Sequence, residues 1–456
     1  MSINRRKFLG ATVLAGAGSM VTNKVKAANE RTPMANGKLG LAVLGVGARG
    51  QSHVEQILYR TDCDIVAIND IDQKSIDACK QLFTKAGKPQ PTVYLNGERG
   101  YLEALKNLAV DAVLIASPWE FHSEMAINAM KAGKYAATEV CGAFSLDECW
   151  ELVNTQESTG KHLFFLENVC YRRDVMAVMN MVRQNLFGEM LHFEGGYQHD
   201  LREVKFNDGK QLYGGGVEFN EKGYSEARWR TRHSVYRNGD LYPTHGVGPI
   251  AMMNNINRGN RFEYLTSMST KGRGLHDYII NHPQGGPSHP NAKVEFKLGD
   301  VTTTMIKCSN GETMTLFHDT NLPRPYSLGF RVQGTKGIWM DVNQSLMIEG
   351  KTKKHSWESA DALLKEYDHP LWKKYEKSAE NAGHGGMDWF VVNSFIEGAK
   401  ANKPAAIDVY DAATWLAITA LSEQSIASGS SAVAFPDFTR GRWMRKKNEF
   451  ASGDTY

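Results

Sequence analysis

Cysteine is scarce in this sequence, and the spacing of its cysteines argues against a zinc site and against a redox-active cysteine pair. The six cysteines stand at positions 63, 79, 141, 149, 170 and 308 of 456 residues. None forms a CxxC pair or lies near a histidine at metal-ligand spacing, which argues against a zinc ribbon or a redox pair. Several fall within apolar runs, where buried free thiols are expected.

A large excess of positive or negative charge is also absent once the N-terminus is set aside. The formal net charge is +3, but the first 27 residues hold five basic residues and no acid, which leaves the rest at −2. A nearly neutral body has no basic surface of the kind that binds nucleic acid. We therefore expect no nucleic-acid partner.

A run of apolar residues long enough to span a membrane is absent too. The mildly apolar stretch 8–21 is too short and too rich in glycine for a stable span. Arg5 and Arg6 precede it, and small residues follow up to Ala27. This order resembles a twin-arginine signal, which exports folded proteins. We expect cleavage near Ala27, a flexible segment over 28–37, and a periplasmic or secreted mature protein.

A glycine-rich turn is the most informative feature that the sequence does contain. Gly45, Gly47 and Gly50 follow the apolar run 39–44, and Asp70 ends another apolar run twenty residues later. This is the dinucleotide-binding fingerprint, in which the glycines permit a tight turn, approach of a pyrophosphate and close helix–strand packing. Asp70 would bind a ribose diol and repel a 2′-phosphate, so the cofactor we predict is NAD.

Alternating apolar runs and helical patterns predict an α/β Rossmann domain over residues 38–170. Its expected strands are 39–45, 64–69, 92–95, 111–117, 135–139 and 162–166. The expected helices are 49–60, 73–86, 98–107, 121–132 and 146–159.

The pattern changes near residue 174, which predicts an α/β substrate domain over 171–400 with a large open, mostly antiparallel sheet. A first helix is expected at 174–185, and the strands at 190–197, 263–270, 292–298, 302–308, 312–319, 328–333 and 337–341. Residues 198–262 and 350–386 interrupt the strand pattern, and loops of that length are usually functional. Helices at 387–400 and 408–428 follow, and we expect the C-terminal part 401–456 to pack back on the Rossmann domain.

Polar and aromatic residues follow strands four, five and six, at the edge where a parallel sheet binds its ligand. They are Trp119, Glu120, Phe121 and His122 after the fourth strand, Glu139 and Val140 after the fifth, and Glu167 and Asn168 after the sixth. His122 also suits the first turn of a helix with no ligand, and both interpretations stay open.

These features resemble the glucose–fructose oxidoreductase and inositol dehydrogenase family. The resemblance rests on the fingerprint, on the S-P-x-x-x-H segment 117–122 and on the acid Glu139. It implies a Rossmann domain followed by a domain with an open antiparallel sheet. Dehydrogenases of that family read Glu-Lys-Pro after strand five, where the lysine takes part in hydride chemistry, whereas this chain reads Glu139-Val140-Cys141.

A second resemblance, to glycoside hydrolase family 109, fits that departure. It rests on Arg49-Gly50, on segments 119–122, 139–140, 167–168 and 229–230, on the stretch NGDLYPTH at 238–245, and on 324–326. The family consists of NAD-dependent α-N-acetylgalactosaminidases, often exported by a twin-arginine signal. The resemblance implies that Ala48, Arg49, Asp70, Trp119, Glu120, Phe121, His122, Glu139, Val140 and Asn168 contact NAD. It implies that Tyr197, Arg230, Tyr242, Pro243, Thr244, His245 and Tyr326 contact the sugar.

The resemblance also implies a glycosidase reaction without net redox change. Hydride leaves C3 of the sugar, the C2 proton becomes acidic, the glycosidic oxygen is eliminated, water adds at C1, and hydride returns. A conventional glycosidase needs two opposed carboxylates instead. NAD ends each turnover as it began, so a tightly bound cofactor suffices for an exported enzyme that hydrolyses a glycan with terminal N-acetylgalactosamine.

His245 is our candidate for proton transfer at C3, because imidazole titrates near working pH. Tyr242 and Tyr197 are candidates for the C2 base or for help to the leaving oxygen, provided that a cation such as Arg230 lowers a phenol pKa from about 10. A lone tyrosine is more often a packing residue, and an arginine more often a surface charge.

Other interpretations remain open. A sugar or polyol dehydrogenase of the same fold is one alternative, and a non-catalytic nucleotide- or sugar-binding protein is another. His199, Asp200, His233 and His276 have irregular spacing without a metal motif, so no metal is predicted. A homo-oligomer formed through the open sheet is a further possibility that the family suggests.

Overall fold

The computed structural model describes residues 37–380 and 382–456. The predicted signal over 1–27, and all but the last residue of the segment 28–37, lie outside the described residues. Among the described helices, none is long and apolar enough to cross a membrane.

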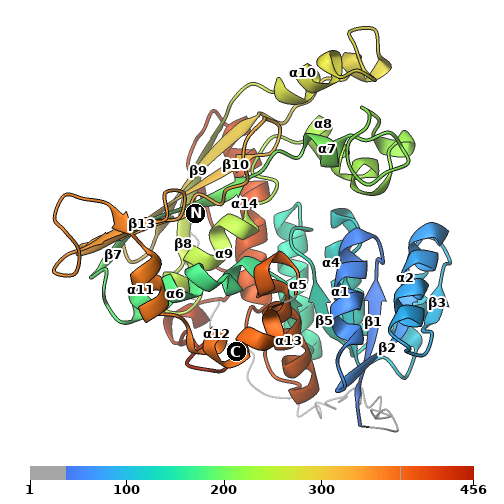
Figure 1. Ribbon diagram of the computed structural model, residues 1–456, viewed down its shortest axis with the longest axis horizontal. Coiled ribbons are helices and arrows are strands. Elements are labelled where there is room, and N and C mark those ends of the chain that lie inside the picture. The colour runs from blue at the N-terminus through green and yellow to red at the C-terminus, as the bar shows by residue number, and fades with distance from the viewer. Residues whose placement is uncertain (1–36, 381) are drawn as a thin grey trace, which may run out of the picture. The chain divides into compact units, whose positions relative to one another are not determined.

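The N-terminal part contains the parallel sheet that the sequence predicts (Figure 1). Its strands, in the order β3-β2-β1-β4-β5-β6, alternate in sequence with helices and match the doubly wound arrangement. Strand β1 is buried along its whole length, as expected for a parallel strand covered on both faces. The strands are β1 Leu39–Leu44, β2 Cys63–Asn69, β3 Thr92–Tyr94, β4 Ala112–Ile115, β5 Tyr135–Thr138 and β6 Leu163–Phe165. The helices are α1 Ala48–Leu58, α2 Gln73–Lys85, α3 Tyr101–Lys106, α4 Trp119–Lys131 and α5 Leu146–Thr159.

A second, nine-stranded sheet follows the short helix η1 (Asn168–Tyr171) and helix α6 (Arg173–Arg183). Its order is β14-β13-β12-β11-β7-β10-β9-β8-β15, and every described pairing except β7–β10 is antiparallel. The predicted fold class is therefore confirmed. The strands are β7 Met190–Gln198, β8 Phe262–Ser269, β9 Val301–Cys308, β10 Thr313–Asp319, β11 Arg331–Gly334, β12 Gly337–Met340, β13 Ser345–Ile348, β14 Glu358–Ser359 and β15 Val433–Ala434.

The strand predicted at 292–298 is wrong. This segment begins with the helical turn η4 (Pro290–Lys293) and continues as irregular chain. The N–H groups of Lys297 and Leu298 donate to the carbonyls of Val235 and Ser234, so they bond to the end of a helix and not to a strand. The apolar residues Val294 and Phe296 of this segment instead pack against a small separate core around Phe206.

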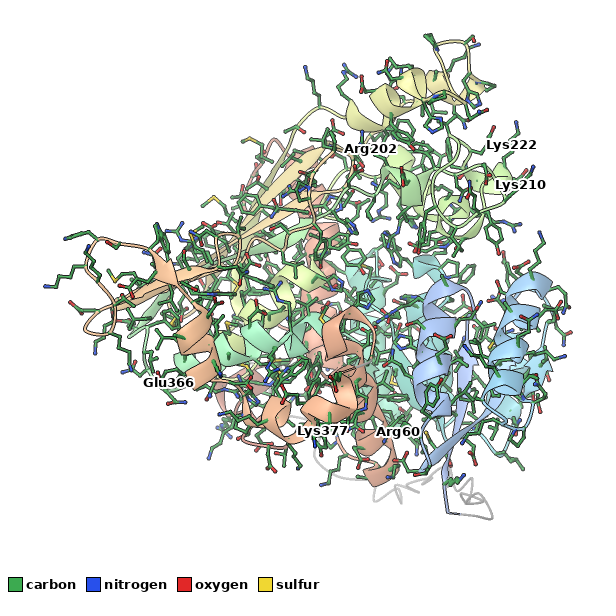
Figure 2. All side chains as sticks on the ribbon, viewed as in Figure 1. Arg60, Arg202, Lys210, Lys222, Glu366 and Lys377 are labelled. Carbon is green, nitrogen blue, oxygen red and sulfur yellow. The ribbon has the colours of Figure 1, made fainter. Side chains whose placement is uncertain are left out.

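Both segments that break the strand pattern contain short helices. Residues 198–262 hold α7 Arg202–Lys205, η2 Asn220–Lys222, η3 Ser225–Arg228, α8 Arg230–Tyr236 and α9 Thr244–Met253. Figure 2 shows Arg202 at the start of α7, with Lys210 on the loop that follows and Lys222 at the end of η2. Helix α10 (Gly274–Asn281) lies beyond β8. Residues 350–386 hold α11 Asp361–Glu366, α12 Pro370–Ala379 and η5 His384–Gly386.

Two long helices near the C-terminus pack against the parallel-sheet part. Helix α13 (Met387–Ala401) contacts α1 and η1, and α14 (Val409–Ala427) contacts α5, β6 and β8. The short helix η6 (Arg442–Met444) follows them. Through these contacts, residues more than 200 positions apart in the sequence meet at the edge of the first sheet.

Three glycines allow α9 to lie directly on β7. A Cβ atom at Gly246 would lie 2.4 Å from the nitrogen of Gly196, and one at Gly195 would lie 2.5 Å from the oxygen of Gly246. No side chain fits between the two backbones. Since α9 begins at Thr244, this close contact sets the position of the first turn of the helix, which carries His245.

Replacing Gly246 with alanine tests this contact. The added methyl group must push α9 away from β7, and overpacking of this kind typically costs about 1–3 kcal/mol. We expect the Gly246→Ala variant to show a lower free energy of unfolding in chemical denaturation. An unchanged unfolding curve would show that α9 can shift without strain.

Candidate active site

The glycine turn has the geometry that a dinucleotide requires. Gly45 has φ +86°, and a Cβ there would lie 2.6 Å from the nitrogen of Ser117. A Cβ at Gly50 would lie 2.0 Å from the carbonyl oxygen of Gly45. The space beside Gly47, in contrast, is open to 4 Å. The turn is therefore packed against the sheet on one side and leaves the start of α1, at Ala48, accessible to a phosphate.

Asp70 lies beside this turn, at the end of β2. One carboxylate oxygen accepts the N–H of Val46 at 2.8 Å, and the other accepts the N–H groups of Ile71 and Asp72. Burial raises the pKa of Asp70, and these hydrogen bonds oppose the rise. The carboxylate is thus held at the position from which an acid binds the adenosine ribose.

The side chain of Arg49 is engaged by two carboxylates. Its Nε donates to Glu139 at 2.6 Å, and its two terminal nitrogens donate to Asp388 at 2.7 and 3.2 Å. Glu139 also lies 2.6 Å from Nε2 of His53 and accepts the N–H of Val140 at 3.0 Å. Burial opposes ionisation of Glu139, but Arg49 and His53 hold its pKa well below the usual range. Arg49 thus ties the glycine turn to β5 and to α13.

The residues after β4 have mixed surroundings. Trp119 packs on Tyr242 at 5.6 Å between ring centroids, so it borders the predicted sugar residues. Glu120 lies 2.8 Å from Arg232 and 3.3 Å from His233, and Phe121 is half-buried against the core. The nitrogens of His122 face the carbonyls of Ser117 and Cys141 at 2.7 and 3.0 Å. We therefore expect His122 to hold the ends of β4 and β5 together.

His245 is positioned by a carboxylate from the first domain. Its Nδ1 lies 2.7 and 3.0 Å from the two oxygens of Glu167, which is fully buried after β6. A carboxylate at Nδ1 fixes the tautomer with its proton on that nitrogen and leaves Nε2 to accept a proton. Pro243 occupies the N-cap position of α9, the helix that carries His245, and Thr244 is fully buried.

Two tyrosines pack against His245, and a third lies beside one of them. The rings of Tyr197 and Tyr242 stack at 4.2 Å between centroids, and both meet the His245 ring edge-on, at 5.5 and 4.9 Å. Tyr326 is half-exposed and lies 6.3 Å from Tyr197. The hydroxyl of Tyr197 is 3.2 Å from Nδ1 of His199. Burial raises the pKa of Tyr197 to about 12, and Arg230 opposes that rise.

Arg230 supplies the positive charge of this cluster. Its guanidinium lies 4.6 Å from the Trp119 ring and 5.6 Å from the Tyr242 ring, and its Nε is 2.9 Å from Glu226. It is buried with the tyrosines, so its charge acts through a medium that screens poorly. The cluster predicted from sequence to bind a sugar is thus brought together, with Trp119 added.

A buried lysine lies behind the cluster and escapes sequence reasoning. Lys205, from α7, donates to Thr320 at 2.8 Å and to Asn321 at 2.6 Å. Burial and the nearby Arg230 lower its pKa to about 7. It lines a water-sized cavity of about 10 Å³ together with Tyr197, Tyr242, Arg230 and His318. Nothing in the pattern Arg202-Glu-Val-Lys205 distinguishes it from a surface lysine.

Glu167, His199 and Asp388 are further residues whose roles the sequence does not reveal. Glu167 occurs in the family motif, but its bond to His245 spans 78 positions. The sequence offers His199 only as a possible metal ligand, whereas in the structure its Nδ1 lies at hydrogen-bond distance from the hydroxyl of Tyr197. Among the described residues, no group of three histidine, cysteine or acidic side chains is arranged to hold a metal.

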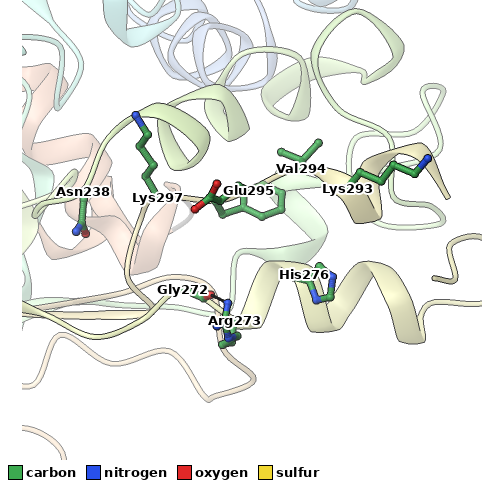
Figure 3. Close-up of a pocket in the computed structure, with 9 residues that line it drawn as sticks. Asn238, Gly272, Arg273, His276, Lys293, Val294, Glu295 and Lys297 are labelled. Atoms are coloured by element: carbon green, nitrogen blue, oxygen red, sulfur yellow. Dashed lines mark hydrogen bonds between the residues drawn. The ribbon is translucent and has the colours of Figure 1, made fainter. Parts of the chain in front are cut away.

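A more open groove than the small cavity beside Lys205 lies elsewhere. It has a volume of about 550 Å³ between α10 and the segment 293–297, and basic side chains, including Arg273, Lys293 and Lys297, line it (Figure 3). None of the residues predicted from sequence to bind NAD or sugar lines it, so the cluster around His245 is our candidate active site.

Asp240 belongs to the NGDLYPTH stretch and is buried without a cation. Its carboxylate accepts the N–H of Tyr242 at 3.1 Å. Burial raises its pKa to about 7. The folded protein therefore holds a proton there that the unfolded chain releases near pH 4. Stability due to this group is complete below pH 4 and is lost as the pH rises toward 7.

Replacing Asp240 with asparagine should remove this pH dependence. The amide oxygen can still accept the N–H of Tyr242, while no charge needs to be buried. We expect Asp240→Asn to gain stability relative to the wild type between pH 4 and 7, by up to about 4 kcal/mol. Urea unfolding at several pH values measures this difference, and parallel stability curves for the two proteins would contradict it.

Comparison with known proteins identifies the family to which this chain belongs. The family model described as glycosyl hydrolase 109, C-terminal domain, matches residues 171–445. The model described as oxidoreductase family, NAD-binding Rossmann fold, matches residues 39–166. The two matches meet between β6 and α6, where the chain passes from the first sheet to the second.

Solved structures with this fold include dehydrogenases. Levoglucosan dehydrogenase in complex with NADH and L-sorbose has a TM-score of 0.63 at 17% identity, over 88% of this chain and 100% of the other. Myo-inositol dehydrogenase from Lactobacillus casei, in complex with NAD(H) and myo-inositol, has a TM-score of 0.57 at 14% identity, over 88% and 99%. At such identities the likeness concerns the fold alone.

Closer relatives cover the whole chain. A glycosyl hydrolase family 109 protein from Stenotrophomonas maltophilia is 50% identical over 100% of both chains. An α-N-acetylgalactosaminidase from Tannerella forsythia is 50% identical over 99% of this chain and 100% of its own. The sequence resemblance is therefore confirmed: the chain belongs to glycoside hydrolase family 109 and has an NAD-binding Rossmann domain as its first part.

Proposed function

We propose that this protein is an α-N-acetylgalactosaminidase that uses a resident NAD and leaves it unchanged after each turnover. The observation that carries the proposal is the Glu167–His245 pair, which places a proton acceptor from the second domain beside the end of β6. The name and 50% identity of the Tannerella forsythia relative support the substrate class.

The described residues fit NAD. The open space at Gly47, the free start of α1 and the carboxylate of Asp70 suit its pyrophosphate and adenosine ribose. Asn168 supplies a buried amide oxygen with no protein partner at the end of β6. When bound, NAD would supply the place to which hydride from C3 of the sugar goes and from which it returns.

His245 would take the proton of the C3 hydroxyl. With its Nδ1 proton held by Glu167, Nε2 is free to act as the base, and Glu167 stabilises the imidazolium that results. Loss of hydride and proton turns C3 into a ketone, which acidifies the C2 proton. The same imidazolium can return the proton to oxygen when the ketone is reduced.

Tyr197 is our candidate for the base at C2. Burial raises the pKa of both stacked phenols, to about 12 for Tyr197, and Arg230 only opposes this rise. Arg230 therefore does not lower the phenol pKa below its usual value, as the sequence prediction requires, and the choice of Tyr197 rests on the neighbour of its hydroxyl. The Tyr197 hydroxyl also has a proton acceptor, His199, at 3.2 Å. Tyr242, which stacks on Tyr197 and packs against His245, is then our candidate to assist the departing glycosidic oxygen.

A sugar dehydrogenase of the same fold is the second candidate. The dehydrogenases among the solved structures favour it, but they share only the fold. At the position of the family lysine this chain has Val140, which is buried. A non-catalytic binding protein would have no need of the buried Glu167–His245 pair.

The reaction can be tested in deuterated water. Purified protein without added NAD should release the chromophore from a chromogenic α-N-acetylgalactosaminide, with deuterium at C2 of the freed sugar. Release without deuterium would contradict elimination. Net NADH formation from free sugars and added NAD, with no release, would favour the dehydrogenase. If neither chromophore release nor NADH formation occurs, the result would favour a non-catalytic binding protein.

Replacing Glu167 with glutamine tests the proton acceptor. The amide cannot stabilise an imidazolium at His245, so we expect kcat to fall by about 10²-fold or more. NAD content should stay near that of the wild type. Glu157→Gln, which changes a carboxylate paired with Arg440 on the surface, serves as the control and should leave kcat unchanged. Equal activity of the two variants would remove Glu167 from the mechanism.

Tyr197→Phe and His245→Ala should separate the two proton transfers. Without Tyr197, C3 oxidation still occurs, so mixing with substrate should give NADH absorbance, while C2 exchange and turnover fall about 10²–10⁴-fold. Without His245, the absorbance itself should not form. Tyr264→Phe, at a half-exposed position of β8, is the control. NADH absorbance in both variants would exclude His245 as the C3 base.

Export and assembly belong to the same proposal. Arg5 and Arg6 precede the apolar stretch of a twin-arginine signal, which would carry the folded protein out with its NAD. Tyr264, Met268 and Met305 are exposed on β8 and β9, and this face of the sheet is where we propose that two copies pair.

A further inference from the structure

Within residues 37–380 and 382–456, the basic residue of the glycine turn is already paired with carboxylates. Arg49 is the basic residue of the turn, and its guanidinium is bonded to both Glu139 and Asp388. One cation and two carboxylates leave this place with a negative charge. The N–H groups at the start of α1 suit a pyrophosphate, and a further cation beside them would offset its repulsion by this net charge.

Asp388 is where these bonds meet. It is fully buried in the first turn of α13, and besides Arg49 it accepts Nδ2 of Asn168 at 2.6 Å. Nδ1 of His384 lies 2.7 Å from its second oxygen. Helix α13 lies beside α1 (Figure 1). Asp388 thus links the start of α13 to the glycine turn and to the end of β6.

The segment before α13 is shaped to carry His384 to this place. His384, Gly385 and Gly386 all have positive φ, and a Cβ at Gly383 would lie 2.7 Å from the Asp388 carboxylate. The His384 side chain is 59% exposed although its Nδ1 is bonded. Nε2 is therefore the nitrogen that a ligand can reach.

We propose that residues 383–388 form a clasp over the bound dinucleotide, in which the imidazolium of His384 contacts the pyrophosphate and holds NAD in the enzyme. The clasp rests on the proposed resident NAD. His384 restores the charge balance that Arg49 alone does not provide. The bond to Asp388 raises the pKa of His384, although burial opposes the rise, so the cation persists at higher pH than in a free histidine.

The clasp also accounts for the unpartnered oxygen of Asn168. Its Nδ2 is committed to Asp388, which turns its buried Oδ1 away from that carboxylate. An amide acceptor beside β6 suits the carboxamide end of NAD. One network would then contact both the pyrophosphate and the nicotinamide end of the cofactor and release it only when its bonds break together.

The test is the rate at which the purified holoenzyme loses NAD. The protein is diluted, passed over a sizing column at intervals, and the NAD that remains bound is measured after acid extraction. We expect His384→Ala to release NAD at least tenfold faster than the wild type. His276→Ala, at an exposed histidine of α10, should release it at the wild-type rate. Equal rates for wild type and His384→Ala would overturn the clasp and leave the proposed function intact.

A pH series gives a second readout. The groups facing His384 are Asp388, Arg49 and Glu139, and the two carboxylates stay ionised above pH 5 because their pKa values are held low. The cation at His384 is lost as the pH rises through its raised pKa. NAD release from the wild type should therefore accelerate with rising pH, and release from His384→Ala should not.

Asp388→Asn provides a variant that keeps the shape of the side chain. It should shift the pH response of NAD release to lower pH, since the carboxylate that raises the pKa of His384 is gone. A wild-type protein that retains no NAD at all would overturn both the clasp and the resident cofactor. A pH response unchanged in His384→Ala would overturn the clasp alone.

Discussion

The bond between Glu167 and His245 is the interaction on which the arrangement of this molecule depends. Glu167 follows the last strand of the parallel sheet, and His245 lies in the first turn of a helix that packs on the second sheet. The carboxylate is fully buried, and burying it without a partner would be expensive. The pair therefore both orients the imidazole and joins the two parts at the place where cofactor and sugar would meet. The close contact of Gly246 with Gly196 keeps α9 near enough for this bond to form.

Burial has opposite consequences for the two kinds of charged group near the site. The carboxylates Glu139 and Asp388 receive several donors each, and their pKa values are held low in spite of burial. Asp240 and Lys205 lack an opposing charge at bonding distance, and burial moves their pKa values to about 7 from opposite directions. The first group gives a rigid, charged frame around the glycine turn. The second leaves groups that exchange protons near neutral pH around the tyrosines.

Sequence reasoning reaches the residues that stand in local patterns. The strands and helices of the first sheet follow from periodicity, and the glycine turn and Asp70 follow from spacing. The segment 292–298 shows the limit, because its alternation resembles a strand but no strand lies beside it to pair. Lys205 stands in no motif, and its bond to Thr320 joins segments 115 positions apart in the sequence. Asp388 meets Arg49 across 339 positions, which no local pattern can indicate.

The sequence by itself determined the fold class, the choice of nucleotide and the family. These depend on glycines, apolar periods and an acid at a given spacing, which act within some thirty residues. The tertiary structure decided which partner each reactive group has. Glu167 bonds to Nδ1 of His245, the hydroxyl of Tyr197 lies beside His199, and Asp388 engages the arginine of the glycine turn. The physical reason is that proton affinity depends on burial and on charges within a few ångströms, and only the folded chain brings these charges together.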